Sequence, residues 1–275
     1  MRHYLSPLIV AALLLVGCLP SVQADQRSEN DQLVSLSLCA DSYLIAMDVP
    51  DRLAGLSWQA GTPLSTWPKD KPVPPRFWAS REISAVLPSR PVTGPGGAIG
   101  LHADEVNLVW GEDFDTVKSN LRLIAMDTGL PVDDLLDAID ALDALPRPER
   151  PPLILYLSRS GASAGPGTFI DAVIRKAGGE NINTAPGWHT PSLEQILTYK
   201  PDIILTSFFG SDYSGMTDRA VRHQALKDYI ASTPRIDIPG KLWPCAGPGL
   251  IDATQRLNVA IRTIDETRDA SGSPS

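Results

Sequence analysis

Leu153–Ser158 (LILYLS) and Ile203–Ser207 (IILTS) are the two stretches of the chain that decide the fold. Each is an almost unbroken run of leucine and β-branched residues, which is typical of a strand covered on both faces of its sheet. Between them, Thr168–Ala177 carries apolar residues at helical spacing, with Thr168 in the N-cap position. A strand, a helix and a second strand in this order predict a βαβ unit in an open α/β sheet.

The ends of these two strands are where we expect a ligand to bind. In open parallel sheets, ligands lie beyond the carboxyl ends of the strands. Those ends are Arg159-Ser160-Gly161 and Phe208-Phe209-Gly210 in this chain. The loop at residues 159–167 consists largely of small residues, and we expect it to let the backbone come close to a ligand.

The segments that surround the second strand resemble a known family. They are the run Ala177–Ile182 (AGGENI), the single Trp188, Ser192–Leu197 (SLEQIL) and Lys200–Ile204 (KPDII). This combination is similar to the C-terminal lobe of periplasmic substrate-binding proteins of ABC importers, in the branch that takes up vitamin B12, iron-siderophores and haem. Val34–Asp41 (VSLSLCAD) and Asp51–Ser57 (DRLAGLS) resemble the opening of the same family.

The resemblance implies an α/β protein with two lobes, each around a mostly parallel sheet, joined by a long helix, with the ligand in the cleft between them. We expect an N-terminal lobe at residues 25–118, linking helices at 119–150, a C-terminal lobe at 151–268 and a tail at 269–275. Apolar residues recur at helical spacing in 115–129 and 132–145. The role of the long helix is assigned to Val132–Leu145 together with the helix before it.

The N-terminal lobe is predicted to contain short elements. Strands are expected at 33–38, 53–58, 106–110 and near Val92, and helices at 42–48 and 82–87. Pro88-Ser89-Arg90 stands where the family has Lys-Pro-Asp, and the Gly-rich loop 94–100 leaves little room for a helix. We therefore expect this lobe to be trimmed on one side.

The beginning of the chain has the pattern of a targeting segment. Leu8–Val16 is an apolar run too short to span a bilayer as a mature helix. A signal peptide at residues 1–24 and a lipoprotein signal at 1–17, which would leave Cys18 lipidated, are both open. Either reading places the protein in the periplasm. The formal net charge of -8 argues against nucleic acid as a partner.

Aromatic residues at strand ends and in loops are the first candidates for ligand contact, because rings supply area and stacking for a large planar molecule. The candidate ligand-binding residues are Cys39, Trp58, Trp78, Arg159, Trp188, Phe208, Trp243 and Cys245. Trp188 is the strongest of them, because it lies six residues before Glu194, as the cleft tryptophan of the B12-binding relatives does. Each tryptophan has the alternative role of anchoring a loop to the core.

The resemblance also implies partners. Glu194 and Glu82 occupy the positions of the two glutamates that dock B12-binding relatives on arginines of the two permease subunits. A carboxylate in the first turn of a helix also favours the helix dipole, which is the structural alternative. The chain is thus expected to be a monomeric, non-enzymatic binding protein without a cofactor. It would deliver a corrinoid, siderophore or haem-like molecule to an ABC importer and its ATPase.

Two other functions compete with this reading. Gly161–Gly165 (GASAG) matches the Gly-x-Ser-x-Gly pattern of a hydrolase, with Ser163 as nucleophile and Asp212 and His223 following in hydrolase order. However, four residues separate the strand from Ser163, whereas a nucleophile elbow turns sharply. A metal-ion binder would need about three converging ligands, and His102, His189 and His223 show no paired spacing.

The cysteines are open to two interpretations. Cys39 and Cys245 would form a disulfide in an oxidising compartment. If the resemblance holds, the two lie on different lobes at the mouth of the cleft, and a bond would lock it. We favour free thiols, or soft contacts to a bound metal complex.

Overall fold

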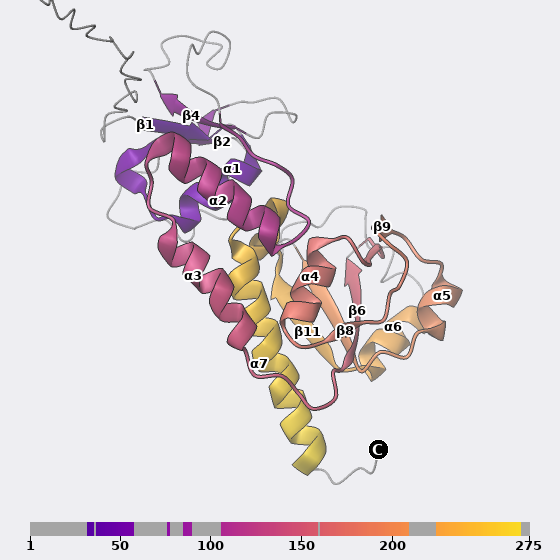
Figure 1. The fold of residues 1–275 in the computed structure, drawn as a ribbon. Helices are drawn as coiled ribbons and strands as arrows, with labels where there is room; N and C mark the ends of the chain where they lie inside the picture. The colour runs from indigo at the N-terminus through magenta and orange to yellow at the C-terminus, as the bar shows by residue number, and fades with distance from the viewer. Residues whose placement is uncertain are drawn as a thin grey trace, which may run out of the picture.

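The computed structural model describes residues 32–35, 37–57, 76–77, 85–89, 106–158, 160–208 and 224–270, which form one main sheet in each lobe with helices around it (Figure 1). The sheet of the N-terminal lobe has the order β3-β2-β1-β4-β5, and that of the C-terminal lobe has the order β11-β10-β6-β8. This arrangement confirms the predicted two-lobe α/β class. The residue boundaries assigned to the lobes stay predictions.

The sheet of the C-terminal lobe is parallel throughout. Its strands are β6 (Leu153–Ser158), β8 (Glu180–Asn181), β10 (Ile203–Phe208) and β11 (Arg235–Pro239). The register pairs Ile203 with Ile154 and Ser207 with Ser158. Ile154, Leu155 and Ile204 are fully buried, because helices cover both faces of this sheet. The continuous apolar runs therefore predicted β6 and β10 correctly.

The helices of this lobe begin at residues that can accept hydrogen bonds from the first turn. They are α4 (Phe169–Lys176), α5 (Leu193–Thr198) and α6 (Gln224–Ser232). The side chain of Thr168 accepts a bond from the backbone of Asp171, and Ser192 and Gln195 form a reciprocal capping box. The helix predicted at 168–177 is confirmed, and a helix also begins after Ser192, within one of the segments that carry the family resemblance.

The N-terminal lobe departs from the expected strand directions. Its strands are β1 (Gln32–Ser35), β2 (Leu53–Ser57), β3 (Arg76–Phe77), β4 (Ala85–Ser89) and β5 (Val106–Asn107). The β1–β2 and β2–β3 pairs are parallel, whereas β1–β4 and β4–β5 are antiparallel. The helix predicted at 82–87 is wrong in its second half, because β4 extends there as the antiparallel partner of β1.

Helix α1 (Leu38–Ala46) starts earlier than predicted, because the side chain of Ser37 accepts a bond from the backbone of Ala40 and caps it. The strand expected at 33–38 accordingly ends at Ser35, and Cys39 lies in the first turn of the helix. A short 3₁₀ turn, η1 (Pro50–Arg52), leads from α1 to β2. The strand predicted near Val92 lies outside the described residues.

Three helical pieces connect the two lobes. Helix α2 (Phe114–Thr128) ends at Gly129, and α3 (Asp133–Ala141) continues as the 3₁₀ turn η3 (Leu142–Ala144). The helix predicted at 132–145 thus ends early as an α-helix. The long helix beside it is α7 (Gly249–Ala270), which follows the 3₁₀ turns η4 (Gly240–Leu242) and η5 (Pro244–Ala246).

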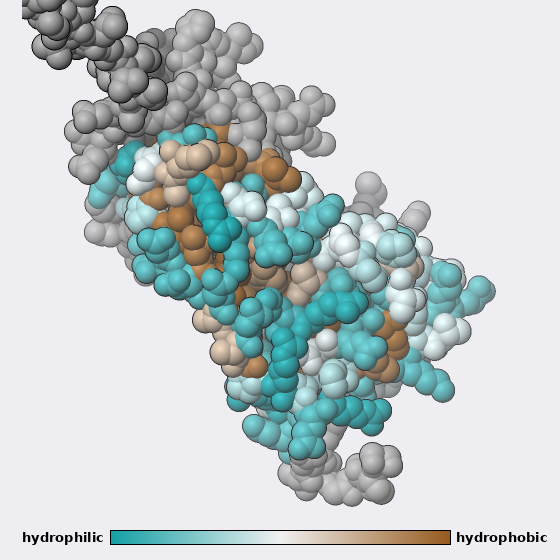
Figure 2. All heavy atoms as spheres, in the orientation of Figure 1, coloured by the Kyte–Doolittle hydropathy of each residue, from teal (hydrophilic) through white to brown (hydrophobic). Residues whose placement is uncertain are grey.

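Helix α7 runs alongside α3 and reaches from the N-terminal lobe down past the C-terminal sheet (Figure 1). It contacts α4 and β11 of the C-terminal lobe. Its buried Asn258 donates to the backbone oxygens of Pro146 and Ala177, and thereby ties the linker to the end of α4. Hydrophilic residues cover most of α7 in the view of Figure 2, whereas hydrophobic side chains gather near α2 and α3.

Two further ion pairs hold the linker. Lys176 of α4 donates to Asp143 of η3 over 2.6 Å and lowers the pKa of that carboxyl group, and Lys118 of α2 pairs with Asp140 of α3. These pairs lie at the surface, so each contributes little to stability by itself.

Among the helices in the described part of the chain, none combines the length and apolar character that a bilayer span requires.

Candidate functional site

A row of aromatic rings leads from the interior of the protein to its surface. Trp243 and Phe169 lie 6.2 Å apart between ring centroids, Phe169 and Trp188 5.3 Å, and Trp188 and Tyr156 6.0 Å in an edge-on arrangement. Trp243, Tyr156 and Phe169 are buried, whereas Trp188 exposes 47% of its surface. Trp188 is therefore the solvent-facing ring of the row, with Phe169 and Tyr156 in contact with it and Trp243 behind Phe169.

The row lies near the carboxyl ends of the parallel strands, where the sequence predicts a ligand. Tyr156 is in β6, and its hydroxyl shares a 2.8 Å hydrogen bond with Ser207 of the neighbouring β10. Burial raises the pKa of Tyr156, so its phenol stays neutral. The phenol therefore supports the row without adding charge to it.

Trp188 is presented by a short hairpin-like pair of strands. Strand β7 (Ser163–Ala164) pairs antiparallel with β9 (Trp188–His189), with Ala164 opposite Trp188. Gly165 follows β7 at a point where an added Cβ would lie 1.8 Å from the oxygen of Ala185, so no larger residue fits. Gly165 thus packs closely on segment 183–185 of the same chain, and the expected approach of the loop to a ligand stays a prediction.

The N-terminal lobe presents a second exposed tryptophan, which the sequence analysis did not single out. Trp110 exposes 57% of its surface and Val109 exposes 65%, just after β5. The buried Asn120 accepts from the backbone nitrogen of Val109 at 3.0 Å and donates to its oxygen at 2.8 Å. Asn120 also donates to the hydroxyl of Tyr43, so a fully satisfied buried amide fixes this exposed apolar pair.

The loop that carries Trp110 lies at the junction of the two lobes. Gly111, the next residue, packs so closely that an added Cβ would lie 2.7 Å from the Cβ of Ala246. Phe114, at the start of α2, lies under the ammonium group of Lys176 from α4, with 5.6 Å to its ring centroid. Trp110 therefore stands beside the segment that also contains Trp243, the inner end of the aromatic row.

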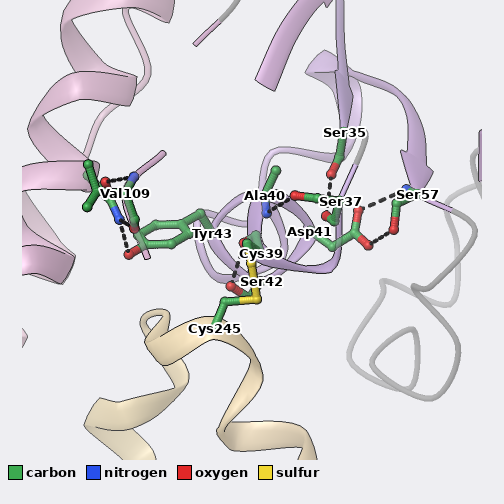
Figure 3. The surroundings of a disulfide bond; sticks show 11 residues. Ser35, Ser37, Cys39, Ala40, Asp41, Ser42, Tyr43, Ser57, Val109 and Cys245 are labelled. Atoms are coloured by element: carbon green, nitrogen blue, oxygen red, sulfur yellow. Dashed lines mark hydrogen bonds between the residues drawn. A yellow bond between two sulfur atoms is a disulfide. The ribbon is translucent and has the colours of Figure 1, made fainter. Parts of the chain in front are cut away.

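A disulfide between Cys39 and Cys245 joins the lobes at the same place (Figure 3). It connects the first turn of α1 to η5, and the Cα atoms lie 5.1 Å apart. The expectation of free thiols is therefore wrong, because the fold places the two side chains within bonding distance. As a disulfide, the sulfurs lack the thiolate that binds a metal.

The neighbouring end of β2 is fixed by a buried carboxylate. Asp41 of α1 accepts from the backbone nitrogen of Ser57 at 2.9 Å and from its hydroxyl at 2.5 Å (Figure 3). Both residues are fully buried. These bonds fix the point where the chain leaves β2 towards Trp58.

Several predicted site residues lie outside the described residues, and their roles stay predictions. They are Cys18, Trp58, Trp78, Glu82 and Arg159. Phe208 is the last residue of β10, where only its backbone is described. Glu194 is exposed in the first turn of α5, as a docking residue or a simple helix-dipole partner would be. This exposed position in the first turn of α5 fits both roles of Glu194.

Ser163 does not have the geometry of a nucleophile. It is fully buried, its hydroxyl donates to the backbone oxygen of Tyr156 at 2.8 Å, and it accepts from the side chain of Asn183 at 3.0 Å. The nucleophile of a hydrolase must instead be accessible and bonded to a base. Asp212 and His223, the other proposed members of a triad, lie outside the described residues.

The described residues contain no group of three or more His, Cys, Asp or Glu side chains placed to hold a metal ion. His189 is partly buried in β9, and its buried Nδ1 atom has no hydrogen-bond partner there. His102 and His223 lie outside the part of the chain that is described.

No protein-family model and no curated protein matches this sequence. Among solved structures, the chain is similar to the periplasmic haem-binding protein HutB of Vibrio cholerae (18% identity, 85% of this chain and 99% of that chain, TM-score 0.60). It is also similar to IsdE of S. aureus complexed with haem (14% identity, 86% of this chain and 98% of that chain, TM-score 0.57). The third is the periplasmic haem-binding protein RhuT from Roseiflexus sp. RS-1, with 18% identity over 84% of this chain and 99% of that chain, and a TM-score of 0.55. The chain therefore has the two-lobe fold of periplasmic haem- and iron-binding substrate-binding proteins, the branch that its sequence resembles.

Proposed function

We propose that this protein is a periplasmic solute-binding protein that holds haem, or a closely similar planar tetrapyrrole, and delivers it to an ABC importer. The observation that carries the proposal is the pair of exposed tryptophans, Trp110 from the N-terminal lobe and Trp188 from the C-terminal lobe. Three of its structural neighbours are haem-binding proteins. Among the corrinoid, siderophore and haem ligands that the sequence leaves open, these neighbours favour haem.

The chemistry of the two tryptophans suits a flat apolar ligand. Each indole ring offers a large face for stacking, and such contacts add about 0.5–1.5 kcal/mol beyond the buried area. The Trp188 ring packs on Phe169 and Tyr156, and Asn120 fixes the backbone of Val109 beside Trp110, so little conformational entropy is lost on binding. A small hydrated metal ion would gain nothing from such rings.

The proposed partner is the two-subunit permease of an importer with its ATPase. Glu194 on the C-terminal lobe and Glu82 on the N-terminal lobe would each meet an arginine of one permease subunit. Two separated and solvated carboxylates orient the protein on a two-fold partner and speed encounter at modest desolvation cost. A signal peptide at 1–24, or lipidation of Cys18, would bring the protein to the periplasm.

The proposal is tested by titrating the purified apo-protein with haemin, cyanocobalamin and a ferric catecholate chelate. We expect saturable one-to-one binding of haemin, with a shifted Soret band and quenched tryptophan emission. Native mass spectrometry of the protein purified from its host should show the mass of bound haem. Saturable binding of cyanocobalamin or the chelate with no binding of haemin would overturn the choice of ligand.

We further infer that Ser163 is not the nucleophile of a hydrolase, because its hydroxyl is buried and bonded to the backbone of Tyr156. A fluorophosphonate probe should leave the wild-type protein unlabelled, and ester substrates should not turn over. Stoichiometric labelling that disappears in Ser163→Ala would establish the enzyme instead.

A further inference from the structure

A ladder of buried polar side chains runs beneath the segment that carries Trp188. Ser163 donates to the backbone oxygen of Tyr156 in β6 at 2.8 Å, and Asn183 donates to the hydroxyl of Ser163 at 3.0 Å. The side-chain oxygen of Asn183 in turn accepts from the backbone nitrogen of Ala185 at 3.2 Å. Ser163 and Asn183 are fully buried.

The ladder continues through Asn181 to helix α4. Asn181 accepts from the backbone nitrogen of Asn183 at 3.1 Å, and donates to the oxygen of Ala164 at 3.0 Å and to Asp171 at 2.9 Å. The other carboxylate oxygen of Asp171 accepts from Arg175 at 2.7 Å. The segment 181–185 is thus bonded by side chains to β7 and α4 directly, and to β6 through Ser163.

The end of the segment beside Trp188 is fixed by backbone bonds as well. The nitrogen of Gly165 donates to the oxygen of Gly187 at 3.0 Å, and the nitrogen of Gly187 donates to the oxygen of Pro166 at 2.9 Å. These bonds sit directly before Trp188. Segment 181–189 therefore carries one half-exposed indole on a backbone with buried anchors along its length.

We propose that Asn183, supported by Asn181, is a positioning residue that holds Trp188 in the orientation required for ligand binding. This inference rests on the proposed function, because it assumes that Trp188 contacts the ligand. A half-exposed indole on a free loop would lose conformational freedom when a ligand bound. The buried amides remove that freedom during folding, so that binding meets a preorganised ring. Asn183 itself is buried and cannot reach a ligand.

A double-mutant cycle with haemin as the probe tests the proposal. Asn183→Ala should weaken haemin binding roughly tenfold in the wild-type background, but less than about twofold in the Trp188→Ala background. The matched control is Asn258→Ala, which removes an equally buried amide with two backbone bonds on α7. It should lower the melting temperature without changing haemin affinity.

Hydrogen exchange of the apo-protein provides a readout that does not depend on the ligand. Asn183→Ala should speed exchange of the backbone amides at 184, 185 and 187–189 at least tenfold, and Asn258→Ala should leave them unchanged. If wild-type protein fails to bind haemin, the proposed ligand fails, while faster exchange still supports positioning by Asn183. Equal affinity losses in both backgrounds, or unchanged exchange at 184–189, would overturn the positioning role. Should Asn183→Ala fail to fold, the isosteric Asn183→Asp is measured in its place, with the same expected outcomes.

Discussion

The disulfide between Cys39 and Cys245 links residues 206 positions apart in the chain and joins helix α1 to the turn that precedes α7. Around it, Gly111 packs on Ala246, and Asn120 bonds both Val109 and Tyr43. The N-terminal lobe is thereby held covalently on the helix that runs past the C-terminal lobe. Movement of the two lobes at this point is limited to what the bond allows.

Reduction of this disulfide should lower the free energy of unfolding substantially. A bond that closes a loop of this length removes chain entropy from the unfolded state, worth about 5 kcal/mol in the loop-closure model. Urea unfolding of Cys39→Ser/Cys245→Ser, compared with wild type, measures the loss. The control is Met126→Ala, an exposed substitution on α2 that leaves the disulfide intact and should not change the unfolding midpoint. Equal unfolding midpoints for the double variant and wild type would contradict the bond.

Trp188→Ala should weaken haemin binding by about 1–3 kcal/mol, because the stacking surface of the ring is lost. The ring is half-exposed, at 47%, so the melting temperature of the apo-protein should change little. Val259→Ala, which truncates an exposed apolar residue on α7, is the control and should bind haemin normally. Calorimetric titration measures the affinities. A large fall in the melting temperature with unchanged affinity would assign Trp188 to the core instead.

Trp110→Ala should weaken haemin binding without lowering stability, because its ring is more exposed than that of Trp188, at 57%. We expect a loss of about 1–3 kcal/mol, similar to that for Trp188. Met126→Ala, at an exposed position of the adjacent helix α2, serves as the control. If Trp110→Ala and Met126→Ala bind haemin equally well, the N-terminal lobe contacts the ligand elsewhere.

Glu194→Arg, alone or with Glu82→Arg, should abolish ligand-stimulated ATP hydrolysis by the reconstituted importer. Reversing the charge turns an attraction to a permease arginine into a repulsion. Haemin affinity of the isolated protein should stay unchanged, since Glu194 is exposed at the start of α5. Glu266→Arg reverses an exposed charge on α7 and should leave stimulation normal. Normal stimulation by the double variant would exclude this docking mode.

Stability should fall as the pH rises from 10 towards 12. Burial raises the pKa of Tyr43 to about 12, against a smaller lowering by its hydrogen bond from Asn120. Below pH 10, Tyr43 is neutral in both the folded and unfolded states, and its contribution is constant. Above pH 10 the unfolded chain releases this proton and the folded protein retains it, so folding becomes less favourable by up to about 3 kcal/mol.

Urea unfolding at a series of alkaline pH values measures this dependence. Tyr43→Phe should be less stable at neutral pH, because Asn120 loses an acceptor, but should show a shallower fall above pH 10. Burial also raises the pKa values of Tyr156 and Tyr229, so some dependence should remain in the variant. If the free energy of unfolding falls with pH equally steeply in Tyr43→Phe and in wild type, the pKa of Tyr43 is the same in the folded and unfolded states.

The sequence by itself predicted the two central strands of the C-terminal sheet and the helices that begin after Thr168 and Ser192. The apolar runs at Leu153–Ser158 and Ile203–Ser207 have one stable solution, which is burial on both faces of a sheet. Thr168 and Ser192 mark the helix starts through side-chain bonds to residues three positions away. These features depend on residues close together in the chain, so the sequence pattern predicts them directly.

Only the tertiary structure decided the remaining features, because they depend on residues far apart in the chain. The strand β4 became strand rather than helix through its antiparallel pairing with β1. The Cys39–Cys245 bond, and the clamp of Asn120 on Val109 beside Trp110, arise where separate segments meet. Residue spacing along the sequence does not predict such contacts, because a hydrogen bond or a disulfide depends on distance in space. The exposed Trp110 was therefore found from the fold, whereas Trp188 was already indicated by the sequence.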